Sequence, residues 1–279
     1  MENIKTNNGL EFPKIGFGTY KSETSAILLA IEAGYRYFDT ALFYGTESNI
    51  AEAIKQSGIK REDFFIASKL WKADLGYEKT KIAFEKTLEN LKSEYIDVFM
   101  IHWPRPDIDN REEWREIDLG FRKLASSRRI LREKTNSRAW PQQFFTIHAE
   151  NIIKNSKILP AVAQLEFHPG HTQTFALNYY REKKILVQAW SPIARGRVND
   201  DELIKELAEK YHVNAAQICL RFCIQENVMP LPKASSMERL KENLAVLNFE
   251  ISPEDMSRLE NMPPLGWSGE HPDRVRIKI

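Results

Sequence analysis

Four side chains near the ends of short apolar runs could together move a proton onto an oxygen atom. They are Asp39, Tyr44, Lys69 and His102. A tyrosine hydroxyl titrates at about pH 10, so it acts as an acid at neutral pH only where a neighbouring cation stabilises its anion. A carboxylate beside a lysine ammonium would hold that ammonium charged, and an imidazole could orient a carbonyl oxygen. The set therefore predicts protonation of an oxygen as a carbonyl becomes an alcohol.

Each of these residues has an ordinary structural explanation when it is taken alone. A lysine at the end of a strand is usually solvated, and a single histidine is usually a hydrogen-bonded structural residue. Their interpretation as one site depends on neighbouring parallel strands, whose carboxyl ends meet at one face of a barrel. Because the set contains no hydride source, carbonyl reduction would also require a bound cofactor.

Short apolar runs alternate along the chain with amphipathic stretches, and these elements would position the four residues. The runs that predict buried strands are Ile15–Gly18, Tyr35–Thr40, Phe64–Lys69, Ile96–His102, Ala161–Phe167, Ile185–Trp190 and Val228–Pro232. The stretches that predict helices are Ser25–Ala33, Glu47–Gln56, Tyr77–Asn90, Ala149–Asn155, Thr174–Lys184, Asp201–Tyr211 and Ser236–Leu247. This alternation favours a parallel α/β fold, and the length suits one (β/α)8 barrel domain over residues 1–279. Thr46 stands where a side chain would cap the second helix.

Composition excludes several classes of protein. The chain has 40 basic and 39 acidic side chains, so it has no global field that would attract nucleic acid or an anionic membrane. It has no apolar run long enough to span a membrane, and its first residues lack the apolar core of a signal peptide. Cys219 and Cys223 lie in the apolar stretch Ala216–Ile224 and are expected to be buried core thiols, without metal ligands nearby. We expect a cytoplasmic monomer that binds no metal.

Seven motifs, in the same order, resemble those of the aldo-keto reductase family. They are Gly16–Tyr20, Asp39–Ala41 with Tyr44–Glu47, Ser68–Trp71, Ile101–Pro104, Gln164–Pro169, Ala189–Pro192, and Leu231–Lys233 followed by Arg239 and Glu242-Asn243. One short motif has little specificity, but seven in order have much. The sequence is most similar to bacterial-type members such as diketogluconate, methylglyoxal and aldehyde reductases.

The resemblance implies an α/β fold, a (β/α)8 TIM barrel with an N-terminal β-hairpin that caps its base. It implies NADPH-dependent reduction of a small aldehyde or ketone, with Tyr44 as the general acid. Lys69 and Asp39 would tune the acid, and His102 would orient the substrate carbonyl. The residues implied to line an apolar substrate pocket are Tyr20, Trp71, His102 and Trp103.

The resemblance also implies a set of residues that bind NADPH (NADP+). They are Gly18, Thr19, Tyr20, Asp39, Gln164, Trp190, Ser191, Lys233, Ser235, Ser236, Arg239, Glu242 and Asn243. Trp190 would stack on the nicotinamide, and Gln164 would bond its carboxamide. Lys233 and Arg239 would bind the 2′-phosphate, since two cations suit a phosphate group. The two serines would assist there, and the last two residues of the set would contact adenine.

The resemblance fails in one stretch, where family members carry a fifth strand that ends in Gly-Val-Ser-Asn-Phe. The Ser and Asn of that motif normally bind the nicotinamide carboxamide, and the motif is absent here. Residues 121–140 instead contain seven basic side chains and one acidic side chain. A buried strand could not hold that many cations without partners. A basic surface loop or solvated helix is the ordinary interpretation of such a run.

A second interpretation is that residues 121–143 are an out-of-frame translation between two compensating shifts. Trp140 followed by Pro141 forces a glycine codon when the codons are read one base later. The next three triplets can then spell Leu-Ser-Asn, as in the family motif. Reading the nucleotides across this stretch decides the matter, because the hypothesis fails if the shifted frame does not encode that motif.

Two other functions remain open. A reductase-like barrel that holds NADPH as a regulatory or structural protein, weakly active or inactive, is favoured by the missing motif. The complete set of four chemical residues argues against it. A hydrolase that uses Ser191 with a histidine lacks a nucleophile-elbow sequence. Gly16 and Gly18 do not form a dinucleotide fingerprint, because Lys21 stands where the third glycine would be.

Overall fold

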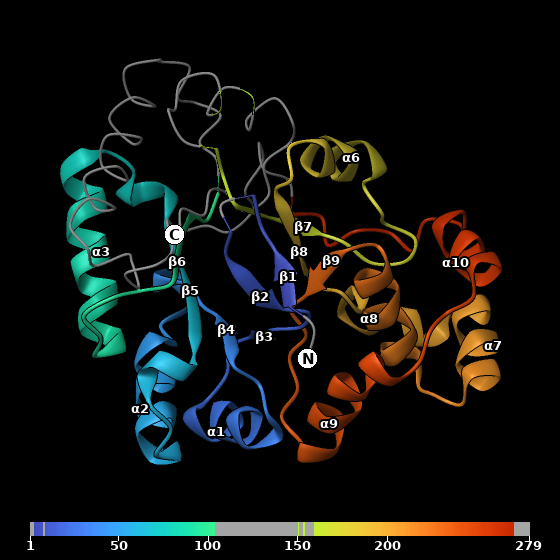
Figure 1. The fold of residues 1–279 in the computed structure, drawn as a ribbon, viewed down its shortest axis with the longest axis horizontal. Helices are drawn as coiled ribbons and strands as arrows, with labels where there is room; N and C mark the ends of the chain where they lie inside the picture. Colours follow the sequence, from blue (N-terminus) through green and yellow to red (C-terminus); the bar gives the residue numbers. More distant parts are fainter. Residues whose placement is uncertain (1–2, 8, 104–149, 151–152, 154–158, 271–279) are drawn as a thin grey trace.

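Helices surround two parallel sheets in the computed structural model, which describes residues 3–7, 9–103, 150, 153 and 159–270 (Figure 1). The strands are β1 (Asn3–Lys5), β2 (Glu11–Pro13), β3 (Phe17–Gly18), β4 (Tyr37–Asp39), β5 (Phe65–Leu70), β6 (Val98–Ile101), β7 (Val162–Glu166), β8 (Leu186–Trp190) and β9 (Val228–Pro230). The α-helices are α1 (Thr24–Ala33), α2 (Glu47–Ser57), α3 (Tyr77–Leu91), α6 (Thr174–Glu182), α7 (Glu202–Tyr211), α8 (Ala215–Gln225), α9 (Met237–Ala245) and α10 (Pro253–Glu260). Residues 121–143 and most of the predicted helix Ala149–Asn155 lie outside the described residues.

All seven predicted strand segments form, and they make parallel sheets with the orders β3-β4-β5-β6 and β7-β8-β9. The sheets meet at one side, where the N–H groups of Gly16 and Gly18 donate to the carbonyl oxygens of Pro230 and Pro232, both at 3.0 Å. A Cβ at Gly16 would lie 2.7 Å from a side-chain atom of Leu231, so glycine permits this approach. The predicted parallel α/β fold is confirmed, and these glycines serve strand contact.

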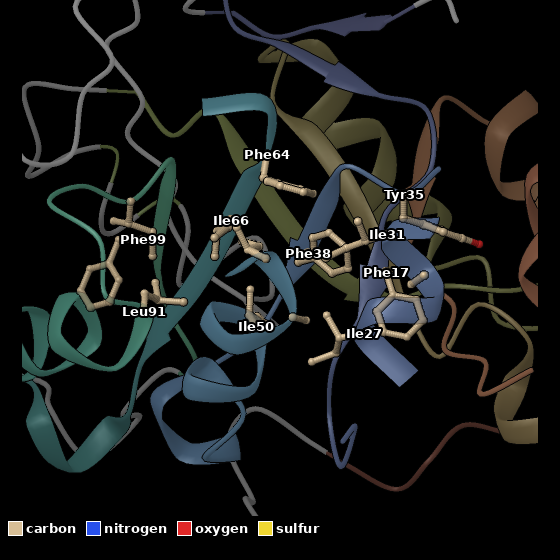
Figure 2. Close-up of a cluster of buried hydrophobic side chains, with 14 of the residues drawn as sticks. Phe17, Ile27, Ile31, Tyr35, Phe38, Ile50, Phe64, Ile66, Leu91 and Phe99 are labelled. Atoms are coloured by element: carbon tan, nitrogen blue, oxygen red, sulfur yellow. The ribbon is translucent and has the colours of Figure 1, made fainter. Parts of the chain in front are cut away.

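The outer faces of the strands pack against the helices. Successive residues of a strand point to opposite faces, so Phe38 of β4 faces outward while its neighbours Tyr37 and Asp39 face the other way. Figure 2 shows Phe38 in a cluster of buried hydrophobic side chains that includes Ile27 of α1 and Ile50 of α2. Burial of each such side chain contributes about 1.5–3 kcal/mol to folding, which fixes the strands that carry the polar residues.

The inner faces of both sheets share one apolar cluster, and the β1-β2 hairpin contributes to it. Phe12 of β2 is fully buried, and its ring lies 5.7 Å from that of Tyr37. The cluster also includes the first residues of three further strands, Val98, Val162 and Leu186. The hairpin therefore covers the amino-terminal ends of the strands, as predicted, and the polar site lies toward their carboxyl ends.

Thr46 occupies the predicted N-cap position of α2, with Glu47 in the first turn, but its side chain does not cap the helix. Its side chain makes no capping hydrogen bond, because its buried hydroxyl lies 3.1 Å from the Thr19 hydroxyl and 2.9 Å from the Thr40 hydroxyl. Three threonines from the segments after β3, after β4 and before α2 are thereby joined. Glu47 at the start of α2 is also buried and accepts a hydrogen bond from Ser68 at 2.6 Å. These contacts fix the loop that carries Tyr44.

Candidate active site

Asp39 and Lys69 form a buried ion pair at the carboxyl ends of β4 and β5. The Lys69 ammonium donates to Asp39 Oδ2 and, at 3.0 Å, to the carbonyl oxygen of Thr40. Burial raises the pKa of Asp39 and lowers the pKa of Lys69, while the charge of each partner opposes that shift in the other. Neither side chain is solvated. Their mutual attraction and their hydrogen bonds therefore have to keep the pair charged.

Tyr44 lies beside this pair because a short turn follows β4. The 3-10 helix η1 (Leu42–Tyr44) ends at Gly45, whose φ of 67° is the left-handed conformation that glycine adopts without strain. The Lys69 ammonium lies 5.0 Å from the centroid of the Tyr44 ring, within range of a cation–π attraction. The Tyr44 hydroxyl lies 3.4 Å from His102 Nε2. The structure thus brings together all four residues singled out for proton transfer.

His102 is buried and follows the last residue of β6. Its backbone N–H donates to the carbonyl oxygen of Leu70 at 2.9 Å, which fixes it beside β5. Burial, together with the nearby charge of Lys69, holds the pKa of His102 well below its usual value. The imidazole is therefore neutral at physiological pH, which suits it to form hydrogen bonds as a neutral group rather than as a cation.

We expect His102 to make stability depend on pH in a predictable direction. Because its folded pKa lies below the unfolded value of about 6.5, the unfolded chain binds more protons as the pH falls below that value. The free energy of unfolding should fall by up to about 1.4 kcal/mol per pH unit from this residue alone. Urea unfolding of wild type and His102→Asn between about pH 7 and about pH 5 measures the contribution of His102 to this pH dependence. An unchanged slope in the variant would contradict the assignment.

The predicted substrate-pocket aromatics gather around Tyr44 and His102. The Tyr20 ring lies 4.9 Å from the Tyr44 ring, and the Trp71 ring lies 5.1 Å from the imidazole of His102. The ring of Trp103 stacks on that imidazole with an interplanar angle of 19° at 6.4 Å. An aromatic wall therefore surrounds the hydroxyl and the imidazole.

Phe43 belongs to this wall and was missed by the sequence-based prediction. Its ring stacks on that of Trp71 with centroids 4.1 Å apart and is one-third exposed, whereas Trp71 is buried. Phe43, not Trp71, therefore presents the accessible ring. Its position directly before Tyr44 was the signal that could have identified it.

Gln164 and Trp190 lie at the other sheet, and each has an unpartnered polar atom. Gln164 is fully buried, and its Oε1 has no hydrogen-bond partner among the residues that the structure describes. The same holds for Nε1 of Trp190, which ends β8 and is half-buried. Ser191 follows with a φ of 48°, so the chain turns sharply there. A carboxamide could pair with the Gln164 oxygen, and Trp190 has an aromatic face suitable for stacking.

The residues predicted to bind a 2′-phosphate lie between β9 and the end of the first turn of α9. The ammonium of Lys233 is exposed and donates to the carbonyl oxygen of Tyr20 at 3.1 Å. Ser236 caps α9 by accepting from the backbone N–H of Arg239. Ser235 and the Arg239 side chain are exposed beside it. Two cations at a helix N-terminus form a suitable site for a phosphate group.

The remaining predicted cofactor residues have mixed surroundings. Thr19 donates to the carbonyl oxygen of Asp39 at 2.9 Å, next to Gly18 in the strand contact described above. Glu242 accepts from Asn214 at 3.1 Å. Asn243 is buried beside Tyr35, whose pKa is raised by burial. Glu242 is thus engaged by another side chain of the protein, and Asn243 is buried on α9.

Three negative findings concern the described part of the chain. It contains no group of three metal-ligating side chains that could hold an ion, and no helix in it is long and apolar enough to cross a membrane. Cys219 and Cys223 are free and buried in α8, as predicted, and burial raises the pKa of both thiols. Neither thiol is therefore suited to nucleophilic chemistry.

Comparisons with known proteins agree over almost the whole chain. The model of the aldo/keto reductase family matches residues 14–263. Glyoxal reductase of Bacillus subtilis (strain 168) is 37% identical over 98% of this chain and 97% of its own. Morphine 6-dehydrogenase of Pseudomonas putida is 32% identical over 93% of this chain and 90% of its own.

Solved structures are similar to the same extent. An aldo-keto reductase enzyme from a Medee basin deep-sea metagenome library has a TM-score of 0.91 at 30% identity, over 99% of this chain and 100% of its own. A Gox0644 variant in complex with NADPH has a TM-score of 0.89 at 28% identity, over 99% of this chain and 98% of its own. A buried aspartate–lysine pair beside a tyrosine and a neutral histidine, together with these matches, shows that the chain belongs to the aldo/keto reductase family of oxidoreductases.

Proposed function

We propose that the protein reduces small aldehydes or ketones with NADPH, and that Tyr44 donates the proton. The observation that carries this proposal is the position of the Tyr44 hydroxyl, 3.4 Å from His102 Nε2 and beside the buried pair of Lys69 with Asp39. No other group of described residues combines an acid, a cation that stabilises its anion and a neutral hydrogen-bonding partner in this way. The arrangement suits protonation of an oxygen that gains negative charge.

Residues at both sheets fit the cofactor. The unpartnered Gln164 Oε1 would accept from the nicotinamide carboxamide, and Trp190 would stack on the ring. Lys233, Arg239 and the N-terminus of α9 would hold the 2′-phosphate. The bound cofactor would supply the hydride for the carbonyl carbon. Support comes from the NADPH complex of the similar Gox0644 variant.

The substrate oxygen would be held between Tyr44 and His102. The neutral imidazole donates to that oxygen and keeps it near the tyrosine hydroxyl. As negative charge develops on the oxygen, Tyr44 transfers its proton, and the Lys69 ammonium stabilises the resulting phenolate. Asp39 keeps the ammonium in place. Phe43 and Tyr20 present the accessible aromatic rings of the pocket, which suits a small carbonyl compound.

Small dicarbonyls and simple aldehydes are the substrates we propose to test first, because the similar Bacillus subtilis protein is named glyoxal reductase. We further infer that the strands close into a (β/α)8 barrel, given the strand contact between Gly16–Gly18 and Pro230–Pro232. A single-domain, cytoplasmic monomer that binds no nucleic acid stays a prediction. NADPH oxidation in the presence of a panel of such carbonyls tests the proposed function.

The alternative, a protein that binds NADPH but has little or no reductase activity, also has a specific reason behind it. The Ser-Asn motif of the fifth strand is missing from the sequence, and the stretch concerned lies outside the described residues. A chain with fewer carboxamide contacts would bind NADPH yet turn over slowly. NADPH binding without oxidation by any carbonyl would favour this alternative.

We expect Arg239→Ala to weaken NADPH binding by about tenfold and to leave NADH binding unchanged. Arg239 would make charge-assisted hydrogen bonds to a phosphate group that only NADPH carries. Fluorescence titration with both cofactors measures the effect. Lys241→Ala is a matched control, because Lys241 is also an exposed cation of α9 but lies two positions further along the helix. Equal weakening for NADPH and NADH would contradict the assignment.

A further inference from the structure

Hydrogen-bonded side chains form a line across the interior between the two sheets, and Gln188 stands within it. Gln164 of β7 and Gln188 of β8 are register partners, and both are fully buried. Gln164 Nε2 donates to Asp39 Oδ1 at 2.6 Å and to Gln188 Oε1 at 2.8 Å. Gln188 Nε2 donates to the Tyr37 hydroxyl oxygen at 2.7 Å. The line thus ends on the carboxylate that holds Lys69, and Gln188 has no role in the chemistry described so far.

The chemistry of the acceptors determines how each amide points. A carboxylate only accepts hydrogen bonds, so Gln164 must present its NH2 group to Asp39. Its second N–H then needs an acceptor in the buried interior, and Gln188 Oε1 is that acceptor. Gln188 must therefore turn its own NH2 group toward Tyr37 and toward Met229 Sδ, which lies 3.4 Å away. All four amide N–H bonds are used, and the two orientations support each other.

One atom of this network is left without a partner. Gln164 Oε1 is buried and has no hydrogen-bond partner in the part of the chain that the structure describes. A buried acceptor without a partner costs free energy, so its retention points to a ligand that donates to it. The orientation that leaves this oxygen available is the one that Gln188 enforces.

We propose that Gln188 is a positioning residue for the reduction. By accepting a hydrogen bond from Gln164, Gln188 fixes the Gln164 amide. The NH2 group of Gln164 then holds Asp39, and its Oε1 stays available to the nicotinamide carboxamide. The inference therefore rests on the proposed function. Without Gln188, the second N–H of Gln164 has no acceptor and the amide can rotate. Both the cofactor contact and the hold on Asp39 then weaken.

Three variants separate this role from simple packing. Gln188→Leu removes the acceptor, and we expect NADPH to bind about tenfold more weakly. Gln188→Glu should restore most of the affinity, because a buried, protonated carboxyl keeps a carbonyl acceptor for Gln164 and an O–H donor for Tyr37. Met229→Leu removes only the sulfur contact and conserves volume, so NADPH affinity should not change. If the leucine variant does not fold, Gln188→Met removes the same acceptor with a side chain of similar length.

The pH profile is a second readout, which a purely structural residue would not move. The hydrogen bond from Gln164 lowers the pKa of Asp39. When Gln188→Leu loosens that bond, Asp39 takes up a proton at higher pH. The fall of kcat on the acid side of its pH profile (the acid limb) should therefore move to higher pH. Gln188→Glu should return the limb toward its wild-type position.

The outcomes distinguish this inference from the proposed function. NADPH titration by protein fluorescence is done first on wild type. If wild type does not bind NADPH, the proposed function fails. If wild type binds and Gln188→Leu binds equally well with an unchanged acid limb, only the inference about Gln188 fails. Equal weakening by Gln188→Leu and Met229→Leu would assign the effect to packing and would also overturn the inference. Weakening by Gln188→Leu alone, with recovery in Gln188→Glu, supports it.

Discussion

Replacement of Tyr44 by phenylalanine is expected to lower kcat by about 10²- to 10⁴-fold, the usual contribution of a general acid. The hydroxyl that faces His102 Nε2 is the only part of the side chain lost, so the ring and its contact with the Lys69 ammonium remain. NADPH affinity should therefore stay within about twofold of wild type, because no predicted cofactor contact uses the hydroxyl. Steady-state assays and cofactor titrations of both proteins measure the two effects.

A matched control for this variant is Tyr95→Phe. Tyr95 loses the same hydroxyl but precedes β6, at the amino-terminal end of that strand, where it stacks on the Arg61 guanidinium 4.4 Å away. Its kcat should equal that of wild type. If Tyr44→Phe retains the wild-type kcat, Tyr44 is not the acid, and the group that protonates the substrate must be sought elsewhere.

Replacement of Lys69 by methionine is expected to reduce both activity and stability. The phenolate of Tyr44 loses its stabilising cation, and Asp39 is left as a buried carboxylate without its ion-pair partner. Breaking a buried ion pair in this way costs about 3–5 kcal/mol of stability. Urea unfolding at neutral pH measures the loss, and kcat should fall by about 10²-fold or more.

The pH dependence and a double variant test the cause of that instability. Without Lys69, the folded pKa of Asp39 rises further above its unfolded value of about 3.9. Since the folded chain then holds the proton more tightly, the deficit relative to wild type should grow as the pH rises from about 4 and shrink as the pH falls. Asp39→Asn combined with Lys69→Met removes the lone charge and should recover most of the stability without recovering activity. A double variant as unstable as Lys69→Met would show that packing, not charge, is responsible.

The strands and the four chemical residues were predictable because each signal is local. Apolar runs of strand length end at Asp39, Lys69 and His102, and parallel strands bring such ends together. Trp71 and Tyr20 were placed near the site by the resemblance to the family, not by such local signals. Helix α10 had local signals too, Ser252 as its cap and Pro253 in its first turn, but its polar sequence masked them.

Gln188 could not be identified in this way, because its role depends on partners far along the chain. An amide inside a strand has no characteristic sequence pattern, and only the register of β7 with β8 places it beside Gln164. The partners of the Thr46 hydroxyl were not predictable for a related reason. That hydroxyl had a choice between a helix cap and the hydroxyls of Thr19 and Thr40, and the fold, not the local sequence, decides between them.

Oxidation of NADPH by the wild-type protein in the presence of glyoxal, methylglyoxal and simple aldehydes is the most direct test of the account. The site of Tyr44, His102, Lys69 and Asp39 predicts that NADPH is consumed in step with formation of the alcohol, and that this rate collapses in Tyr44→Phe. NADPH that binds tightly but is oxidised with none of the carbonyls would contradict the account and would identify a reductase-like binding protein instead.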